Sequence, residues 1–327
     1  MLSDCISGRA CISSECRRLR AFRDSLQLSQ TFIGAAEKGL LPKPKCIVYT
    51  NLACDANLLT FHRLAEFYHV PVFSIDVPSR QTASNVAYVA AQLRALKRFL
   101  EQTTGRLIDE DLLAERVARG RETLEEFEKF QSARADRFIP SDLVSPLYSG
   151  MTNNILLGTE EEKLYTEKLL KDIKNAPPKK GKHIYWMHTI PFWSDAVKEA
   201  LLLNDSAQIV GCELSQVADL SVHSEDPYEE MAMRLVYHAL NGPISRRIEA
   251  GIHHAKQAGA DGAVWFNHWG CKHTLGGSRI AKKRFEEAGI PMLILDGDGC
   301  DRSHGGEGQT STRLGAFLEM LGDFDHE

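Results

Sequence analysis

Short apolar segments alternate with amphipathic helical segments along most of this 327-residue chain, and this alternation restricts the fold more than any other feature. The apolar segments are too short for buried helices and are rich in Val and Ile, which indicates buried strands. A strand, a helix and a second strand in succession form a parallel unit. The sequence therefore predicts an α/β protein with two doubly wound parallel-sheet domains, of the Rossmann or flavodoxin type, with helical connections.

The N-terminal part of the chain shows this pattern first. Residues 46–50 and 70–75 are predicted strands on either side of a predicted helix at 56–68. The other helices predicted in this part cover 17–38, 82–104 and 109–136. In the last of these, apolar residues keep one helical face among many charged residues, which are typical of a solvated helix surface.

A link rich in helix-breaking residues, Ala176-Pro-Pro-Lys-Lys-Gly-Lys182, precedes a second α/β pattern. Its predicted strands are 183–187, 207–211, 262–266 and 292–295, and its predicted helices are 193–203, 227–239, 243–258, 276–289 and 309–321. A further predicted helix at 159–174 leads into the link. We therefore expect an N-terminal domain over residues 1–145 and a C-terminal domain over residues 146–327, joined across about 140–180.

Composition excludes several classes of function. The net charge is −5, from 39 basic and 44 acidic residues, so the chain as a whole is not suited to nucleic acid. No stretch approaches the roughly 18 to 20 apolar residues that a membrane helix needs. The N-terminal segment MLSDCISGRACISSECRRLR lacks the apolar core of a secretory signal. We expect a soluble, cytoplasmic protein that binds neither nucleic acid nor a membrane.

The eight cysteines are the residues most suited to chemistry, and they lie at positions 5, 11, 16, 46, 54, 212, 271 and 300. Disulfides are not expected in a large chain without an export signal, so buried thiols, metal ligands and catalytic thiols are the alternatives. Cys54, Cys271 and Cys300 each follow a predicted strand, and Cys212 ends one. Cys46 begins a strand and is interpreted as a core thiol.

Ligands of parallel sheets bind beyond the carboxyl ends of the strands, and the next helix N-terminus stabilises a thiolate there. The chain has no CxxC pair, which structural zinc sites usually contain, and no closely spaced ferredoxin motif. Cysteines scattered over separate loops favour a cluster held between domains. GxGxxG, GxxxxGK(S/T) and GxSxG are absent, so dinucleotide binding, a phosphate loop and a hydrolase elbow are not supported.

Several motifs, in a consistent order, resemble the 2-hydroxyglutaryl-CoA dehydratase D-component family. The resemblance spans about residues 15 to 321. The family includes both subunits of these dehydratases and the related subunits of ATP-dependent benzoyl-CoA reductase. The motifs are Asn51-Leu-Ala-Cys-Asp55, Pro71-Val-Phe-Ser-Ile-Asp-Val-Pro78, Trp269-Gly-Cys-Lys272, Phe285-Glu-Glu-Ala-Gly-Ile-Pro291, Asp296-Gly-Asp298, Glu307-Gly-Gln-Thr-Ser-Thr-Arg313 and Phe317-Leu-Glu-Met-Leu321.

This resemblance implies a 4Fe–4S cluster held by three cysteines, two from the first domain and one from the second. By motif, Cys54 and Cys271 are two of the ligands. The third is Cys16, with Cys11 as the competitor. Cys300 is a possible additional ligand, which would fit the branch of the family that binds a double-cubane 8Fe–9S cluster and reduces small molecules.

The resemblance also implies a radical reaction on a 2-hydroxyacyl-CoA, with partners. A separate ATP-hydrolysing activator with its own iron–sulfur cluster would supply one electron of low potential, and a ketyl radical of the thioester would then expel water. A sister subunit of the same fold, or a second copy of this chain, would complete the enzyme. His268, Glu213 and His273 are candidates for acid–base catalysis, and a structural or surface role is the alternative for each.

Three other functions stay open from the sequence. The chain is alternatively a benzoyl-CoA reductase-type subunit, a double-cubane reductase without a CoA substrate, or a non-catalytic subunit that carries a cluster. The iron content per chain separates the double-cubane function from the others, and all these functions belong to anaerobic metabolism.

Overall fold

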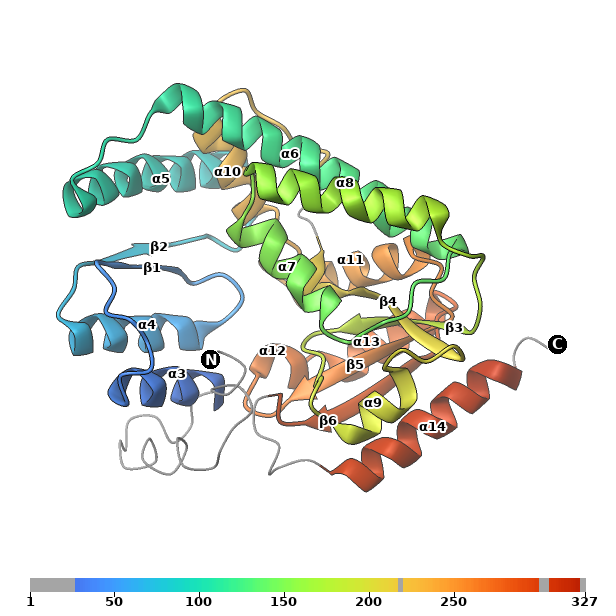
Figure 1. Cartoon of the computed structure of the whole chain (residues 1–327). Coiled ribbons are helices and arrows are strands. Elements are labelled where there is room, and N and C mark those ends of the chain that lie inside the picture. The colour runs from blue at the N-terminus through green and yellow to red at the C-terminus, as the bar shows by residue number, and fades with distance from the viewer. Residues whose placement is uncertain (1–26, 217–219, 300–305, 324–327) are drawn as a thin grey trace. The chain divides into compact units, whose positions relative to one another are not determined.

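The computed structural model describes residues 27–216, 220–299 and 306–323, which are coloured in Figure 1. The chain divides into two compact units. Unit 1 contains Met1–Val117 and Ala218–Arg247, and unit 2 contains Ala118–Val217 and Ile248–Glu327. Each unit is thus assembled from two separate parts of the chain. The expected domain division between residues 145 and 146 remains a prediction.

Unit 1 contains a parallel pair of short strands, β1 (Ile47–Thr50) and β2 (Val72–Ile75). They are joined by α4 (Asp55–Tyr68), which ends because His69 takes a left-handed conformation, with φ of 52°. A small apolar cluster packs α3 (Gln27–Glu37) on α4. These elements form the strand–helix–strand unit that the sequence predicts.

The larger core of unit 1 lies between β2 and two helices, α5 (Ala83–Thr104) and α10 (Pro227–Val236), which run side by side in Figure 1. The Thr82 hydroxyl accepts a hydrogen bond from Asn85 N–H and so caps the start of α5. The helices bury apolar side chains against each other and against the residues that end β2. These side chains are Ile75, Val77, Val86, Val89, Ala90, Leu93, Tyr228, Ala232 and Val236.

Unit 2 contains a four-stranded parallel sheet with the strand order β4-β3-β5-β6. The strands are β3 (Lys182–Met187), β4 (Ala207–Cys212), β5 (Gly262–His268) and β6 (Met292–Gly297). Every residue of β4 and β5 is buried. Strands that are covered on both faces consist largely of apolar residues, which is why the sequence pattern could identify them.

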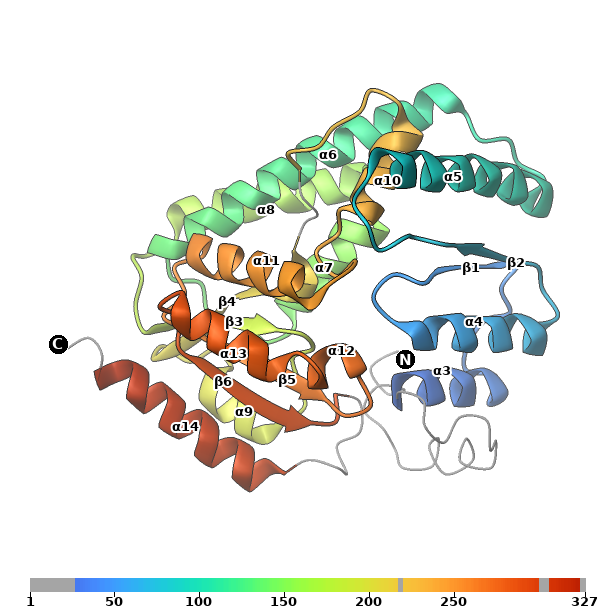
Figure 2. The same ribbon diagram turned by 180° about the vertical axis from the view of Figure 1, so that it is seen from behind.

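Helices cover both faces of this sheet, as Figures 1 and 2 show from opposite sides. One face carries α9 (Asp195–Leu201) and α14 (Glu307–Asp323), and the other carries α11 (Ile244–Gln257) and α13 (Ser278–Glu287). The Glu307 carboxylate accepts hydrogen bonds from the Ser194 hydroxyl at 2.8 Å and from Ala196 N–H at 2.9 Å. The first turn of α14 therefore also stabilises the N-terminus of α9, where a negative charge is favourable.

The remaining elements are helical. They are α6 (Glu110–Ala133), η2 (Arg134–Asp136), α7 (Ser145–Ile155), α8 (Glu160–Asn175), η3 (Glu213–Ser215) and α12 (Lys272–Leu275). The predicted α/β class with parallel sheets is confirmed. The sequence analysis did not predict α7, whose polar residues hide its helical period, or α12, which has a single turn. It also ended β5 at residue 266, two residues too early.

Within the described residues, no helix combines the length and the apolar composition required to cross a bilayer.

The free edge of β6 is partly covered by Arg313 from α14. Pro291 O and Gly297 O accept hydrogen bonds from the β5 side, from Ala263 N–H and Trp269 N–H. Because main-chain groups alternate along a strand, those of Ile294 point to the opposite, free edge. The Arg313 guanidinium donates a hydrogen bond to Ile294 O there. A cation at a sheet edge is a common protection against pairing with another chain.

The close packing of α7 on η3 gives a stability prediction for Gly150. A Cβ at this position would overlap the main-chain carbonyl of Leu214, which has no flexible side chain to move away. We expect Gly150→Ala to lower the free energy of unfolding by about 1–3 kcal/mol, as measured by chemical denaturation. Gly315→Ala is the matched control, because this glycine in α14 has open space around it. That control should stabilise the protein by about 0.5–1 kcal/mol, and equal effects of the two changes would contradict the packing described here.

Candidate functional site

Cys54 occupies the loop that follows β1 in unit 1. It is the N-cap residue of α4, with an extended conformation (φ −149°, ψ 115°), and it is partly buried. Ala53, directly before it, has a φ of 71°. A non-glycine residue rarely adopts this left-handed conformation, which costs on the order of 1 kcal/mol and is found often at functional sites.

Asn51 fixes the shape of the Cys54 loop. Its side-chain amide donates to Asp76 Oδ1 at 2.7 Å, and its side-chain oxygen accepts from Val77 N–H at 2.8 Å. Asp76 and Val77 directly follow β2, so Asn51 joins the two loops at the carboxyl ends of β1 and β2. Asn51 and Asp76 both belong to the motifs that carry the family resemblance, and the structure gives them this common role.

Cys271 holds the corresponding position in unit 2. It lies beyond the end of β5, is the N-cap residue of α12 and has an exposed fraction of 8%. Its N–H donates to His268 O at 3.0 Å, and its carbonyl accepts from the Thr274 hydroxyl at 3.0 Å. Gly270 has a φ of 82°, which allows the chain to turn sharply from the strand into the helix.

Cys54 and Cys271 therefore share one local design. Each thiol lies between the carboxyl end of a parallel strand and the first residue of a helix. The N–H groups of a helix N-terminus favour a negatively charged thiolate, which is the form that binds a metal. The donor chemistry at both positions fits an iron–sulfur cluster.

The other described cysteines differ from this design. Cys212 is the last residue of β4, is fully buried and donates a hydrogen bond through Sγ to His188 O at 3.5 Å. Burial raises the pKa of the Cys212 thiol to about 12, so it stays protonated at neutral pH. Cys46, predicted to begin a strand as a core thiol, directly precedes β1 and is only partly buried.

The complete predicted ligand set extends beyond the described residues. Cys11, Cys16 and Cys300 lie outside them. Cys54 belongs to unit 1 and Cys271 to unit 2, so each is described within its own unit. Within residues 27–216, 220–299 and 306–323, no three His, Cys, Asp or Glu side chains are grouped as metal ligands. The ligand set therefore stays a prediction.

His268, a candidate for acid–base catalysis, is the last residue of β5 and has an exposed fraction of 3%. Its Nδ1 accepts a hydrogen bond from Gly299 N–H at 2.8 Å. Burial lowers the pKa of His268, and the nearby Asp298 carboxylate opposes this effect only in part. The other ring nitrogen, Nε2, is buried and has no hydrogen-bond partner among the described residues.

His188 is a residue that the sequence analysis missed. It directly follows β3 and has a φ of 73°. Its N–H donates to Glu213 Oε2 at 3.0 Å, and its carbonyl accepts the Cys212 thiol, so the end of β4 holds it in this conformation. Its ring stacks on the His268 ring, with 6.1 Å between centroids. The position directly after a predicted strand was the signal that could have identified His188.

The other two candidates for acid–base catalysis have different surroundings. Glu213 is buried, with an exposed fraction of 6%, and its carboxylate binds the main chain of His188. His273 is an exposed residue of α12. Of the three, His268 and Glu213 lie at the carboxyl ends of β5 and β4, on either side of β3, and His188 at the end of β3 contacts both. His273 faces solvent.

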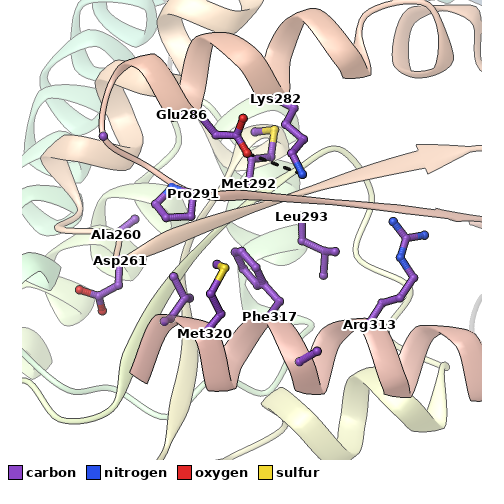
Figure 3. A pocket seen from close by; sticks show the side chains of 13 residues that line it. Ala260, Asp261, Lys282, Glu286, Pro291, Met292, Leu293, Arg313, Phe317 and Met320 are labelled. Atoms are coloured by element: carbon purple, nitrogen blue, oxygen red, sulfur yellow. Dashed lines mark ion pairs between the residues drawn. The ribbon is translucent and has the colours of Figure 1, made fainter. Parts of the chain in front are cut away.

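A cavity of about 910 Å³ lies elsewhere in unit 2, beside edge strand β6 and between α13 and α14 (Figure 3). Phe317 and Met320 contribute to its apolar lining, and Lys282 and Arg313 are its cations. It also borders Asp261 and Pro291, which directly precede β5 and β6. It therefore lies toward the amino ends of β5 and β6, away from Cys271 and His268, where parallel sheets rarely bind substrates.

Comparison with known proteins agrees with the motifs at these strand ends. The chain is 23% identical over 305 residues to the (R)-phenyllactyl-CoA dehydratase alpha subunit of Clostridium sporogenes, an alignment that covers 88% of this chain and 74% of the relative. It is 23% identical over 303 residues to the (R)-2-hydroxyglutaryl-CoA dehydratase subunit alpha of Acidaminococcus fermentans, which covers 86% of this chain and 61% of the relative.

The chain thus spans less than two thirds of the length of the second relative. The family profile described as "2-hydroxyglutaryl-CoA dehydratase, D-component" matches residues 10–321. This match includes both candidate ligands, Cys54 and Cys271, and nearly the whole sequence. The resemblance in the motifs is confirmed, and the chain belongs to the 2-hydroxyglutaryl-CoA dehydratase D-component family.

Proposed function

We propose that this chain is the iron–sulfur subunit of a 2-hydroxyacyl-CoA dehydratase. The observation that carries the proposal is the shared position of Cys54 and Cys271, each between a parallel strand and a helix N-terminus, inside motifs of the family. Both relatives are named as alpha subunits of such dehydratases. Their names make (R)-phenyllactyl-CoA and (R)-2-hydroxyglutaryl-CoA the first substrates to test.

The proposed cofactor is a 4Fe–4S cluster held by Cys54, Cys271 and a third cysteine, Cys16 or Cys11. When bound, it would supply the one-electron chemistry by which a reduced thioester loses water in a radical elimination. The chain itself would bind and orient the acyl-CoA and exclude water from it. In unit 2, the buried His268 and the His188 ring that stacks on it would contribute to this binding.

We further infer that both units are doubly wound and that the enzyme needs partners. Helices on both faces of the parallel sheet in unit 2 support the first inference. The sequence has no phosphate-binding loop, so a separate ATP-dependent activator with its own cluster would deliver the electron. The name "alpha subunit" of the relatives supports a sister subunit of the same fold, and a homodimer is the alternative.

A double-cubane reductase is the second candidate function. Cys300 follows the last residue of β6, Gly297, by three residues, so a further cysteine comes after a strand of the same sheet. This cysteine would suit a larger 8Fe–9S cluster in place of a single cubane. A benzoyl-CoA reductase-type subunit and a non-catalytic cluster-bearing subunit would retain the single cubane.

The ligand proposal predicts the iron content of cysteine variants. Protein purified without oxygen should be brown and contain about four iron atoms per chain, with acid-labile sulfide. Cys54→Ala and Cys271→Ala should lose nearly all of this iron, because each removes a thiolate that the cluster requires. Iron and sulfide analysis with the visible absorption spectrum measures the effect.

Two matched controls test whether strand-end position decides the ligands. Cys46→Ala and Cys212→Ala also remove a thiol, but from the start of a strand and from a fully buried, protonated position. Both should keep their iron. Iron loss in Cys46→Ala with retention in Cys54→Ala would contradict the assignment. Loss of about half the iron in Cys300→Ala, from a total near eight, would favour the double cubane.

The partnership predicts how activity depends on other proteins. The isolated chain should show neither ATPase nor dehydratase activity. Turnover of a 2-hydroxyacyl-CoA should require a family activator, a reductant, MgATP and the sister subunit, and it can be followed by chromatography of the CoA esters. Turnover by this chain alone without nucleotide would refute the proposal. Turnover of a small non-CoA substrate by the activated protein would favour the double-cubane reductase instead.

A further inference from the structure

The cavity between α13 and α14 (Figure 3) has an inner wall that belongs to the hydrophobic core of unit 2. Phe317 and Leu321 line it, and both pack in the core of the sheet, with exposed fractions of 6% and 3%. A Cβ at Gly262 in β5 would lie 2.8 Å from Leu321 Cδ1 and 2.9 Å from Phe317 Cζ, so this glycine lets both side chains pack closely on the strand. The inner wall is therefore fixed in place without a ligand.

The same cavity is accessible from solvent. Met320 and Ala316 of α14 line it, and both are exposed residues. Its volume of about 910 Å³ falls within the range of roughly 300–1,000 Å³ that is typical of pockets for small molecules. Loops at the carboxyl strand ends form the usual ligand sites of parallel sheets, but the walls here are two helices and the side of an edge strand. The cavity is therefore separate from the candidate site at Cys271.

Two cations reach this cavity from opposite walls, Lys282 from α13 and Arg313 from α14 (Figure 3). The Lys282 ammonium pairs with the Glu286 carboxylate at 3.6 Å, which is longer than a good hydrogen bond. The Arg313 guanidinium donates to Ile294 O, and it lies 3.7 Å from the Asp296 carboxylate. Within the described part of the chain, neither cation donates a hydrogen bond to a carboxylate.

The acids that border the cavity, in contrast, are used within the protein or loosely paired. Asp261 accepts hydrogen bonds from Lys179 Nζ at 3.0 Å and from His183 N–H at 2.7 Å. Glu286 is half exposed, and an exposed ion pair such as its pair with Lys282 contributes little. Figure 3 shows the two cations on the side of the cavity away from Asp261. The unused hydrogen-bonding capacity at that end therefore consists of cationic N–H donors.

We propose that this cavity binds a small monocarboxylate with an apolar body, either a short alkyl chain or an aryl group. The carboxylate lies between Lys282 and Arg313, and the apolar body lies against Phe317 and Met320. A guanidinium can bind a carboxylate through two parallel N–H groups, and Arg313 has enough donors to keep its bond to the main chain of β6 as well. The Glu286 carboxylate beside Lys282 disfavours a more highly charged ligand such as a phosphate ester.

This binding site goes beyond the proposed function and does not depend on it, because neither a cysteine nor an acyl-CoA takes part. A bound acid would connect α13 to α14 across the edge of the sheet. Because the site requires the folded arrangement of both helices, binding should stabilise the folded protein.

Calorimetric titration of the full chain, purified without oxygen so that any cluster is retained, tests the charge requirement. The probes are octanoate and 3-phenylpropionate. Each is compared with its uncharged amide, octanamide or 3-phenylpropionamide, which has the same apolar body. We expect at least one acid to bind about ten-fold tighter than its amide, the effect of a charge-assisted hydrogen bond. The bound acid should also raise the midpoint of thermal unfolding, increasingly with its concentration.

Three substitutions locate the site. Lys282→Met removes the charge, keeps a similar length and should reduce the preference for the acid several-fold, since only one cation then remains. Lys283→Met is the matched control and should change nothing. Lys283 is the next residue of α13 and pairs with Glu287 at 3.8 Å, much as Lys282 pairs four residues ahead, but it does not line the cavity. Ala316→Trp fills the cavity from an exposed position and should abolish binding of acid and amide alike.

The outcomes that would overturn the inference are equally specific. Equal affinity for acid and amide would remove the role of the cations, and acid binding that persists in Ala316→Trp would place the ligand elsewhere. Absence of binding of both acids at about 10 mM would exclude the site. If Lys282→Met does not fold, Arg313→Gln replaces it, because it removes the other charge and keeps an N–H donor for Ile294 O. None of these results depends on iron or an acyl-CoA, so the inference and the proposed function can fail separately.

Discussion

Parallel pairing places four carboxyl strand ends at one edge of the sheet in unit 2. The pairing consists of main-chain hydrogen bonds of β3 with β4 and β5, and of β5 with β6. Helices on both faces bury the apolar residues of these strands, and a group of polar side chains lies at the carboxyl ends. His188, Glu213, His268 and Asp298 all lie there, each buried or partly buried. Their proximity follows from parallel pairing, because an antiparallel sheet would divide them between two edges.

Local surroundings then decide what each cysteine can do. Cys212 and Cys271 are both buried, and both lie near the carboxyl end of a strand. Cys212 is the last residue of β4, and its buried thiol keeps its proton. Cys271 lies three residues beyond the end of β5, at the start of a helical turn. A shift of a few residues along the chain thus separates a thiol packed inside the sheet from one at the start of a helical turn beyond it.

The sequence was sufficient for the elements whose signal is local. The strands of unit 2 consist of short apolar runs, and these runs were enough to predict that Cys54 and Cys271 each follow a strand. Their selection as ligands came from the family motifs and stays a prediction. The polar end of β5 was not predictable in this way. Asn267 and His268 look like loop residues, and they are accommodated in a strand because Asp296 and Gly299, about thirty positions later, supply hydrogen bonds. The strain at His188 depends likewise on β4, and the packing of α10 against α5 joins residues more than 130 positions apart, as in the ion pair of Arg94 with Asp226.

The segments of the two units alternate along the chain, and this order has a consequence for folding during synthesis on the ribosome. The core of unit 1 needs Tyr228, Ala232 and Val236 of α10, so the first 117 residues are synthesised before these three side chains can cover them. By the time α10 has been made, β3 and β4 are already present, but they lack β5 and β6. Neither unit can be completed before the other has begun. While residues up to α10 are being synthesised, both cores are therefore incomplete, and incompletely buried apolar surface of this kind favours aggregation.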